Sequence, residues 1–545
     1  MLFTVHRYIF RELLRVFVLA VVALTLILSL GSILQPIQQY GVGPRQVVHL
    51  MGYFLPITLT FVLPMAALFA GSLVYGRFAS DNELDACRAS GISLPTLVCP
   101  GLALAIMVAA ANLVLSFYVM PVFVHLAEKS LKADAEQILF RNIQRRRYYK
   151  LPPDDRYLIY ADHADLKNDT LYGVVVVEMR GYEIKNIISA EAARIIFNPH
   201  DKFNEVQITA IKPRRMDEGH EGEVESVVLT AELGSLLGDE IQFKKIDQMR
   251  RIERDLMLFY PIEKLALETY AQFTIELLAR DIRAHITSRP KRDEAPPGAA
   301  ADANGFYELL GEPNSVRFTA GQCAVRGQQV ELSDDDELVV IEYDTDSRKP
   351  VHTLRCTEAT LSTEGEELAP TLTMDMRNAR QAESGQLKMR PIVRGLILPR
   401  AVQTIATEFK TENGLLRVEK LAGNLRGLRP SQKLASLQNK LRRKIRKTQA
   451  QIKSEIHSRL VSGIGCVPMI LIGIGLGIIK KGGHLLSAFA ASCVPAAVLI
   501  VCVMSGKHIT ENLSAQTVSG VTLMWAGLGF LSVLVVLMFG WLLRR

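Results

Sequence analysis

The polar residues with the clearest chemical pattern lie in a short segment, residues 76–93, between two long apolar stretches. Glu83 follows Ser80 by three residues, which is the spacing of a capping box at the start of a helix. Leu84 and Cys87 would share one face of that helix, and Gly91 suits its end. The sequence therefore predicts a short amphipathic helix between two apolar segments. The alternative is a helix that only lies at a membrane interface and joins its neighbours.

The catalytic and cofactor motifs that would make the chain an enzyme are absent. No G-x-x-x-x-G-K-[ST], H-E-x-x-H or G-x-S-x-G pattern occurs, and the 11 histidines show no metal-ligand spacing. Gly506-Lys507 is followed by His508 and lacks the upstream glycine of a phosphate-binding loop. The sequence thus predicts no catalytic residue, no metal and no cofactor. A net charge of +7 over 545 residues does not indicate nucleic-acid binding.

Long apolar segments stand on both sides of this polar loop and recur at the other end of the chain. A helix that crosses a bilayer needs about 20 apolar residues, because only its own hydrogen bonds satisfy the backbone there. Six segments meet this requirement: residues 16–34, 51–75, 94–124, 460–479, 485–506 and 518–543. The first is too long for a signal-peptide core and has no cleavage site. None carries a charge near its centre, which disfavours ion-driven transport.

The orientation follows from lysine and arginine in the short loops. Nine such residues fall on one side: Arg7, Arg11, Arg15, Arg77, Arg88, Lys480, Lys481, Arg544 and Arg545. Only Arg45 and Lys507 fall on the other. We therefore expect a multi-pass membrane protein with both termini in the cytoplasm and residues 125–459 on the other side of the membrane. The basic run at 440–453 opposes this assignment, but long exported regions escape the charge rule.

The middle of the chain is predicted to be a β domain with an insertion. Short β-rich runs separated by polar turns begin at residue 157 and favour a sandwich or jelly roll. Residues 262–287 have helical spacing, and residues 289–298 are typical of a linker. Strands resume at 315, and residues 431–457 predict a long polar helix that enters the fourth apolar segment. Cys323 and Cys356 lie in the exported region and could be paired or free.

The loop and the layout together resemble one known family, the LptF/LptG (YjgP/YjgQ) permeases of lipopolysaccharide export. Residues 81–84, Asp-Asn-Glu-Leu, and residues 89–93, Ala-Ser-Gly-Ile-Ser, fit the coupling-helix signature of that family in register. Glu455 and Arg459 are similar to its Glu-x-x-x-Arg entry to the fourth span. The arrangement of three spans, a periplasmic jelly roll and three spans is also the same. Departures are a longer exported region and the insertion near residues 250–310.

The resemblance implies an α-helical membrane fold with six transmembrane helices (3+3) and an inserted extracytoplasmic all-β jelly-roll-like domain. The residue pattern adds an extra helical and linker insertion to this domain. The implied boundaries are residues 1–125 for the first three spans with a coupling helix at 77–92, 126–250 for the first part of the jelly roll, 251–310 for the insertion, 311–430 for a further β region, 431–459 for the polar helix and 460–545 for the last three spans.

The resemblance also implies a permease subunit of an ATP-driven lipid exporter, with no ATPase site of its own. Its partners would be a cytoplasmic ABC ATPase dimer, a second permease of the same type (a paralogue or a second copy), a periplasmic jelly-roll bridge protein, and lipopolysaccharide or a related glycolipid. Residues expected to couple to the ATPase are Arg77, Asp81, Glu83, Leu84 and Arg88, with Glu83 in the ATPase groove. Spans one, two and five would line an apolar cavity, with Gln35, Gln38 and Arg45 at its rim.

Two alternatives stay open at this point. The first is a membrane-anchored scaffold or sensor whose exported β domain binds a partner without coupling to ATP. The second is an ABC permease for another lipid or for a lipoprotein. A co-purifying ATPase would distinguish the exporters from the scaffold, and the lipids retained by the complex would distinguish the two exporters.

Overall fold

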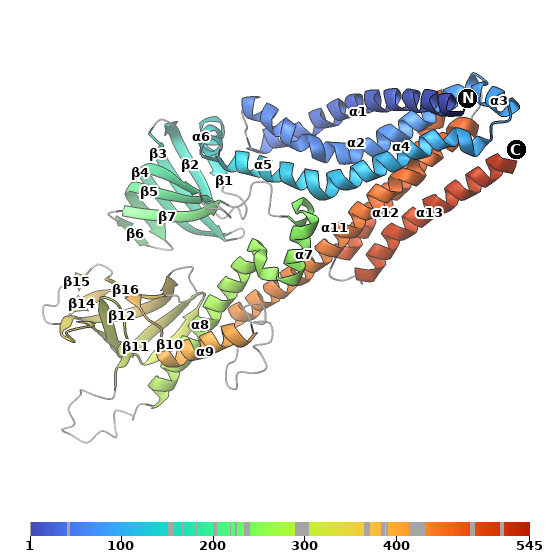
Figure 1. Cartoon of the computed structure of the whole chain (residues 1–545). Helices are drawn as coiled ribbons and strands as arrows, with labels where there is room; N and C mark the ends of the chain where they lie inside the picture. Colours follow the sequence, from blue (N-terminus) through green and yellow to red (C-terminus); the bar gives the residue numbers. More distant parts are fainter. Residues whose placement is uncertain are drawn as a thin grey trace. The chain divides into compact units, whose positions relative to one another are not determined.

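The structure is a computed structural model that divides into two compact units, Met1–Glu253 with Lys447–Arg545, and Arg254–Arg446 (Figure 1). It describes residues 2–40, 44–133, 135–150, 157–165, 168–180, 183–199, 204–217, 220–223, 226–233, 240–288, 305–364, 371–382, 387–388, 391–413, 431–479, 485–512 and 517–544. The linker expected at residues 289–298 lies outside the described residues.

Long apolar helices make up most of the first unit. Six helices of the described chain are long and apolar enough to cross a membrane: Phe3–Ser29, Gly52–Ser80, Leu94–Ser130, Gln432–Ile479, Cys493–Glu511 and Ser519–Arg544. They belong to α1 (Leu2–Tyr40), α2 (Pro44–Ser80), α4 (Leu94–Val114) with α5 (Met120–Ala133), α11 (Gln432–Ile479), α12 (Leu485–Glu511) and α13 (Thr517–Arg544). This confirms the six apolar helices that the sequence predicts.

Glycines bring α11 into backbone contact with α2. A Cβ on Gly473 would lie 2.8 Å from the carbonyl oxygen of Leu68, and one on Gly477 would lie 2.7 Å from that of Ser72. Contacts this short leave no room for a side chain, and small residues allow such close approach between membrane helices. The glycine-rich stretch of α11 therefore serves helix packing.

Replacing Gly473 by Val is expected to destabilise the first unit by about 1–3 kcal/mol, because the added methyl groups would force α11 away from α2. The measurement is the thermal midpoint of the purified protein in detergent. Gly529→Val is the matched control, since a Cβ at Gly529 has no atom within 4 Å. An equal shift in both variants would show that the α2–α11 contact is not the cause.

The first unit also contains an antiparallel seven-stranded sheet with the strand order β1-β2-β3-β4-β5-β6 and with β7 paired to β5. The strands are β1 (Tyr148–Lys150), β2 (Tyr157–Asp165), β3 (Thr170–Arg180), β4 (Glu183–Pro199), β5 (Asn204–Asp217), β6 (His220–Glu223) and β7 (Ser226–Leu233). Alternating residues such as Ile159, Val174 and Ile208 form the buried face. Leu139 and Phe140 of α6 (Ala135–Arg146) pack into the same core. The order is that of a meander, and the jelly-roll topology stays a prediction.

The second unit contains a separate antiparallel sheet of nine strands. Its main path is β15-β14-β12-β11-β9-β8, with β10 on β11 and with β13 between β12 and β16. The strands are β8 (Tyr307–Leu309), β9 (Asn314–Phe318), β10 (Gln322–Arg326), β11 (Gln329–Asp344), β12 (Pro350–Glu364), β13 (Thr371–Arg377), β14 (Ala379–Gln381), β15 (Leu387–Lys388) and β16 (Ile392–Leu396). Phe273 and Leu277 of α8 (Tyr260–Ser288) pack into its core with Phe318.

The two β regions form separate sheets in different compact units, whereas the sequence favoured one β domain with an insertion. Among the described strands, none of the first sheet pairs with one of the second. Alternation of apolar and polar residues identifies a strand but carries no information about which strand it pairs with. The helical segment predicted at 262–287 is α8, and it covers the second sheet instead of interrupting the first.

The remaining short helices are η2 (Ile241–Phe243), α7 (Ile246–Arg254), η3 (Leu256–Leu258) and α9 (Arg400–Asn413). Ser431 caps the start of α11, where its hydroxyl accepts the N–H of Leu434 at 3.1 Å. The carboxylate of Glu276 on α8 accepts the N–H of Ser431 at 3.1 Å, and an acidic group at this end also suits the helix dipole. The predicted polar helix and the fourth apolar segment are thus one helix of 48 residues.

Cys323 and Cys356 are both free thiols in the structure. Burial raises the pKa of Cys356 to about 12, with the carboxylate of Glu337 adding to the effect, and burial also raises the pKa of Cys323. Because the thiolate is the nucleophile, we expect Cys356 to resist iodoacetamide at pH 8, where about one thiol in ten thousand is ionised. Mass spectrometry of the native and the unfolded protein checks this. Rapid labelling of native Cys356, or a disulfide in the unreduced protein, would contradict it.

Candidate functional site

The loop between α2 and α4 holds a short helix, α3 (Glu83–Ala89). Its end is a Schellman motif: the N–H of Ile92 donates to the carbonyl of Cys87 at 3.1 Å, and the N–H of Gly91 to that of Arg88 at 2.9 Å. Gly91 has φ +84°, a conformation that glycine adopts without strain. The predicted helix and its glycine stop are present in the structure.

The start of α3 differs from the prediction. The residue before the helix is Asn82 with φ 57°, and its side chain makes no capping hydrogen bond. Ser80 is the last residue of α2, so it does not cap α3. The apolar run of α2 continues through Phe78 and Ala79, which are both buried, and this keeps Ser80 in the preceding helix.

The five candidate coupling residues are placed differently around this loop. Asp81, Glu83 and Arg88 are exposed. Leu84 is only 5% exposed and packs into the core, so it holds α3 to the neighbouring helices. Arg77 donates from Nη2 to Glu12 Oε1 of α1 at 3.1 Å, so it links two helices.

One core ties α3 to the ends of several long helices. Leu84 shares it with Leu13 near the start of α1, with Leu97 near the start of α4 and with Leu542 at the end of α13. The N-terminal end of α1, the C-terminal end of α13 and the loop therefore lie at the same end of the helices, as Figure 1 also shows. A force on α3 would reach α1, α4 and α13 through these buried side chains.

An apolar cavity of about 430 Å³ lies among the long helices. It is lined by α1, α2, α11 and α12, through Ala20, Ala23, Leu24, Met65, Leu68, Phe69, Met469, Cys493, Ala496, Ala497 and Ile500. Spans one, two and five are the ones expected to line such a cavity, and Met469 of α11 adds a fourth wall. A lining without charged groups suits hydrocarbon chains. Gln35, Gln38 and Arg45, the expected rim, lie in α1 and α2, but their side chains are outside the described part of the structure.

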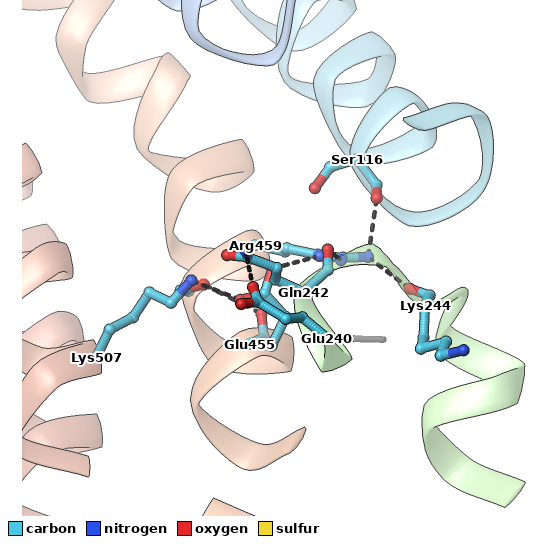
Figure 2. Close-up of polar contacts among 8 residues, drawn as sticks. Ser116, Glu240, Gln242, Lys244, Glu455, Arg459 and Lys507 are labelled. Carbon is cyan, nitrogen blue, oxygen red and sulfur yellow. Dashed lines mark hydrogen bonds and ion pairs between the residues drawn. The ribbon is translucent and has the colours of Figure 1, made fainter. Parts of the chain in front are cut away.

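A buried cluster of charged groups lies where α11 and α12 meet segments from two other parts of the first unit (Figure 2). Arg459 Nε donates to Glu455 Oε1 at 2.9 Å, and Lys507 Nζ of α12 donates to Glu455 Oε2 at 2.6 Å. The remaining donors of Arg459 reach backbone carbonyls of Ser116, Gln242 and Lys244. The Glu-x-x-x-Arg spacing points to the first pair, whereas no sequence feature points to Lys507 or the carbonyl acceptors.

Comparison with known proteins agrees with these features. Residues 7–250 match the family model described as lipopolysaccharide export system permease LptF/LptG. This range contains α3 with its loop and the whole of the first sheet. No curated protein matches the chain. The match confirms the resemblance seen in the sequence: residues 7–250 are similar to the LptF/LptG family of permeases.

Proposed function

We propose that this chain is the permease subunit of an ATP-driven exporter that extracts lipopolysaccharide or a related glycolipid from the inner membrane. The family match over residues 7–250 carries the proposal. The apolar cavity supports it, because its lining would accept acyl chains and exclude charged solutes. A cytoplasmic ABC ATPase dimer would supply the energy, since the sequence has no phosphate-binding loop.

The proposed topology places both termini and residues 77–92 in the cytoplasm, with residues 125–459 in the periplasm and three spans on each side of them. Two observations support it. The charge count of the short loops favours this orientation. In addition, one core contains residues from the starts of α1 and α4, from the end of α13 and from the loop that holds α3. These segments must therefore lie on the same side of the membrane.

In the proposed assembly, Asp81, Glu83 and Arg88 contact the ATPase, while Arg77 and Leu84 hold α3 to the helices. A second permease of the same type would complete the path for the lipid. The first sheet would pass the lipid to a periplasmic bridge protein of similar fold by pairing of edge strands. The second unit, residues 254–446, lies outside the family match, so its role is not part of this proposal.

The test is purification from the native host in mild detergent, followed by mass spectrometry of bound proteins and lipids. We expect an ABC ATPase and a phosphorylated glycolipid to co-purify. If an ATPase co-purifies with a different lipid or with a lipoprotein, the protein is still an ABC permease, but its cargo is that molecule. Recovery of the chain without any ATPase would favour the membrane-anchored scaffold instead.

A further inference from the structure

The cluster around Arg459 joins parts of the first unit that are distant in sequence. Nη1 donates to the carbonyl of Ser116 at 2.9 Å and to that of Lys244 at 3.3 Å, and Nη2 donates to the carbonyl of Gln242 at 2.6 Å. With the bond from Nε to Glu455, the guanidinium donates four hydrogen bonds, and all three of its nitrogens take part. The Arg459 side chain is only 3% exposed, so these bonds replace its water shell.

The carbonyl acceptors belong to two structurally distinctive segments. Ser116 lies in a π-helical turn, η1 (Leu115–Val119), between α4 and α5. Such turns often mark functional sites, because they widen the helix and displace its carbonyls. Phe117 of the same turn lies under the guanidinium, with the ring centroid 5.6 Å from the Arg459 Cζ. Gln242 and Lys244 follow the first sheet along the chain, in and after η2. Arg459 thus connects span three to the segment that leads out of this sheet.

Glu455 extends the cluster to the wall of the apolar cavity. Its Oε2 accepts from Lys507 of α12, and the Lys507 side chain is 29% exposed while that of Glu455 is 10% exposed. The same helix lines the cavity with Cys493, Ala496, Ala497 and Ile500. Lys507 is two turns from Ile500, which is about 10 Å along the helix axis. A displacement of α12 by material in the cavity would therefore move the ammonium group that Glu455 binds.

From this arrangement we infer that Lys507, Glu455 and Arg459 form an ionic relay that transmits occupancy of the apolar cavity to residues 242–244, after the first sheet. In this relay, Lys507 moves with α12, and the Glu455 carboxylate binds both Lys507 and Arg459. Arg459 is the positioning residue, because its guanidinium holds the backbone at Ser116, Gln242 and Lys244. The inference rests on the proposed function, since it takes a lipid as the occupant of the cavity.

The experiment is hydrogen–deuterium exchange of the purified complex, with and without lipopolysaccharide added in detergent micelles. In the unaltered protein, lipid is expected to change the exchange rate of the amides in residues 240–246 by about ten-fold, a typical coupling between two sites. Lys507→Gln should abolish this change, because Arg459 keeps its own contacts but loses the link to α12. Lys507→Arg should restore it. Lys453→Gln is the matched control, since Lys453 is an exposed lysine of α11 outside the cluster.

The possible results distinguish a failure of the relay from a failure of the proposed export function. If Lys507→Gln retains the full lipid response, or if the unaltered complex binds lipid without any change at 240–246, the relay is overturned and the export function stands. If the unaltered complex binds no lipid at all, both fall. Lipid retention measured alongside shows that a lost response in Lys507→Gln does not come from an empty cavity.

Discussion

Replacing Glu83 by Lys is expected to abolish the stimulation of ATP hydrolysis by lipid in the purified complex. Glu83 is exposed on the first turn of α3, and Leu84 beside it is buried, so the carboxylate is held on a rigid support and directed away from the core. A lysine at this position reverses the charge offered to a partner, and like charges brought together at an interface cost several kcal/mol. The measurement is the ratio of lipid-stimulated to basal ATP turnover.

The folded chain should tolerate this substitution. A lysine in the first turn of a helix opposes the helix dipole by only about 0.3–1 kcal/mol. Assembly should therefore persist in part, while turnover loses its response to lipid. Glu253→Lys is the control, because Glu253 is an exposed carboxylate on α7. Unchanged stimulation in Glu83→Lys would argue against docking through this residue, and equal loss in the control would point to a general charge effect.

Replacing Ala497 by Trp is expected to lower the amount of glycolipid that co-purifies by about ten-fold or more, which corresponds to about 1.4 kcal/mol of binding free energy. Ala497 lines the apolar cavity on α12, where a large ring would occupy space that the proposal gives to acyl chains. Because the cavity measures about 430 Å³, one indole removes a substantial part of it. Quantitative mass spectrometry of the retained lipid measures the effect.

A matched variant is available on the same helix. Val501 is 60% exposed and does not line the cavity, so Val501→Trp places the same side chain on the outer surface of α12. Its retained lipid should equal that of the unaltered protein. Normal lipid content in Ala497→Trp would mean that the cargo binds elsewhere, whereas loss in both variants would indicate a disturbed helix.

The six apolar helices and the helix α3 could be predicted, because the residues that determine each of them lie close together in the sequence. The length of an apolar run decides whether it can cross a bilayer, and the Gly91 stop lies within the helix it ends. The start of α3 could not be predicted, because the continuation of α2 through Ser80 depends on burial of Phe78 and Ala79 in a core from distant segments. The Arg77–Glu12 pair, 65 residues apart, is equally invisible in a local pattern.

The two sheets and the Arg459 cluster could not be predicted for different reasons. The patterns at 157–211 and 315–376 predict strands that the structure contains, but strand pairing depends on tertiary contacts, so the patterns do not show that there are two sheets. Arg459 meets Ser116, Gln242 and Lys244 through backbone carbonyls, which every residue possesses. The identity of these residues therefore carries no information about the contact.

The backbone contact at Gly473 and Gly477 has a mechanical consequence. Where side chains separate two helices, rotamer changes can absorb a small displacement, but no such compliant layer lies between α2 and α11 at these glycines. A displacement of α2 at this contact must therefore move α11 with it, so the two helices behave as one rigid unit.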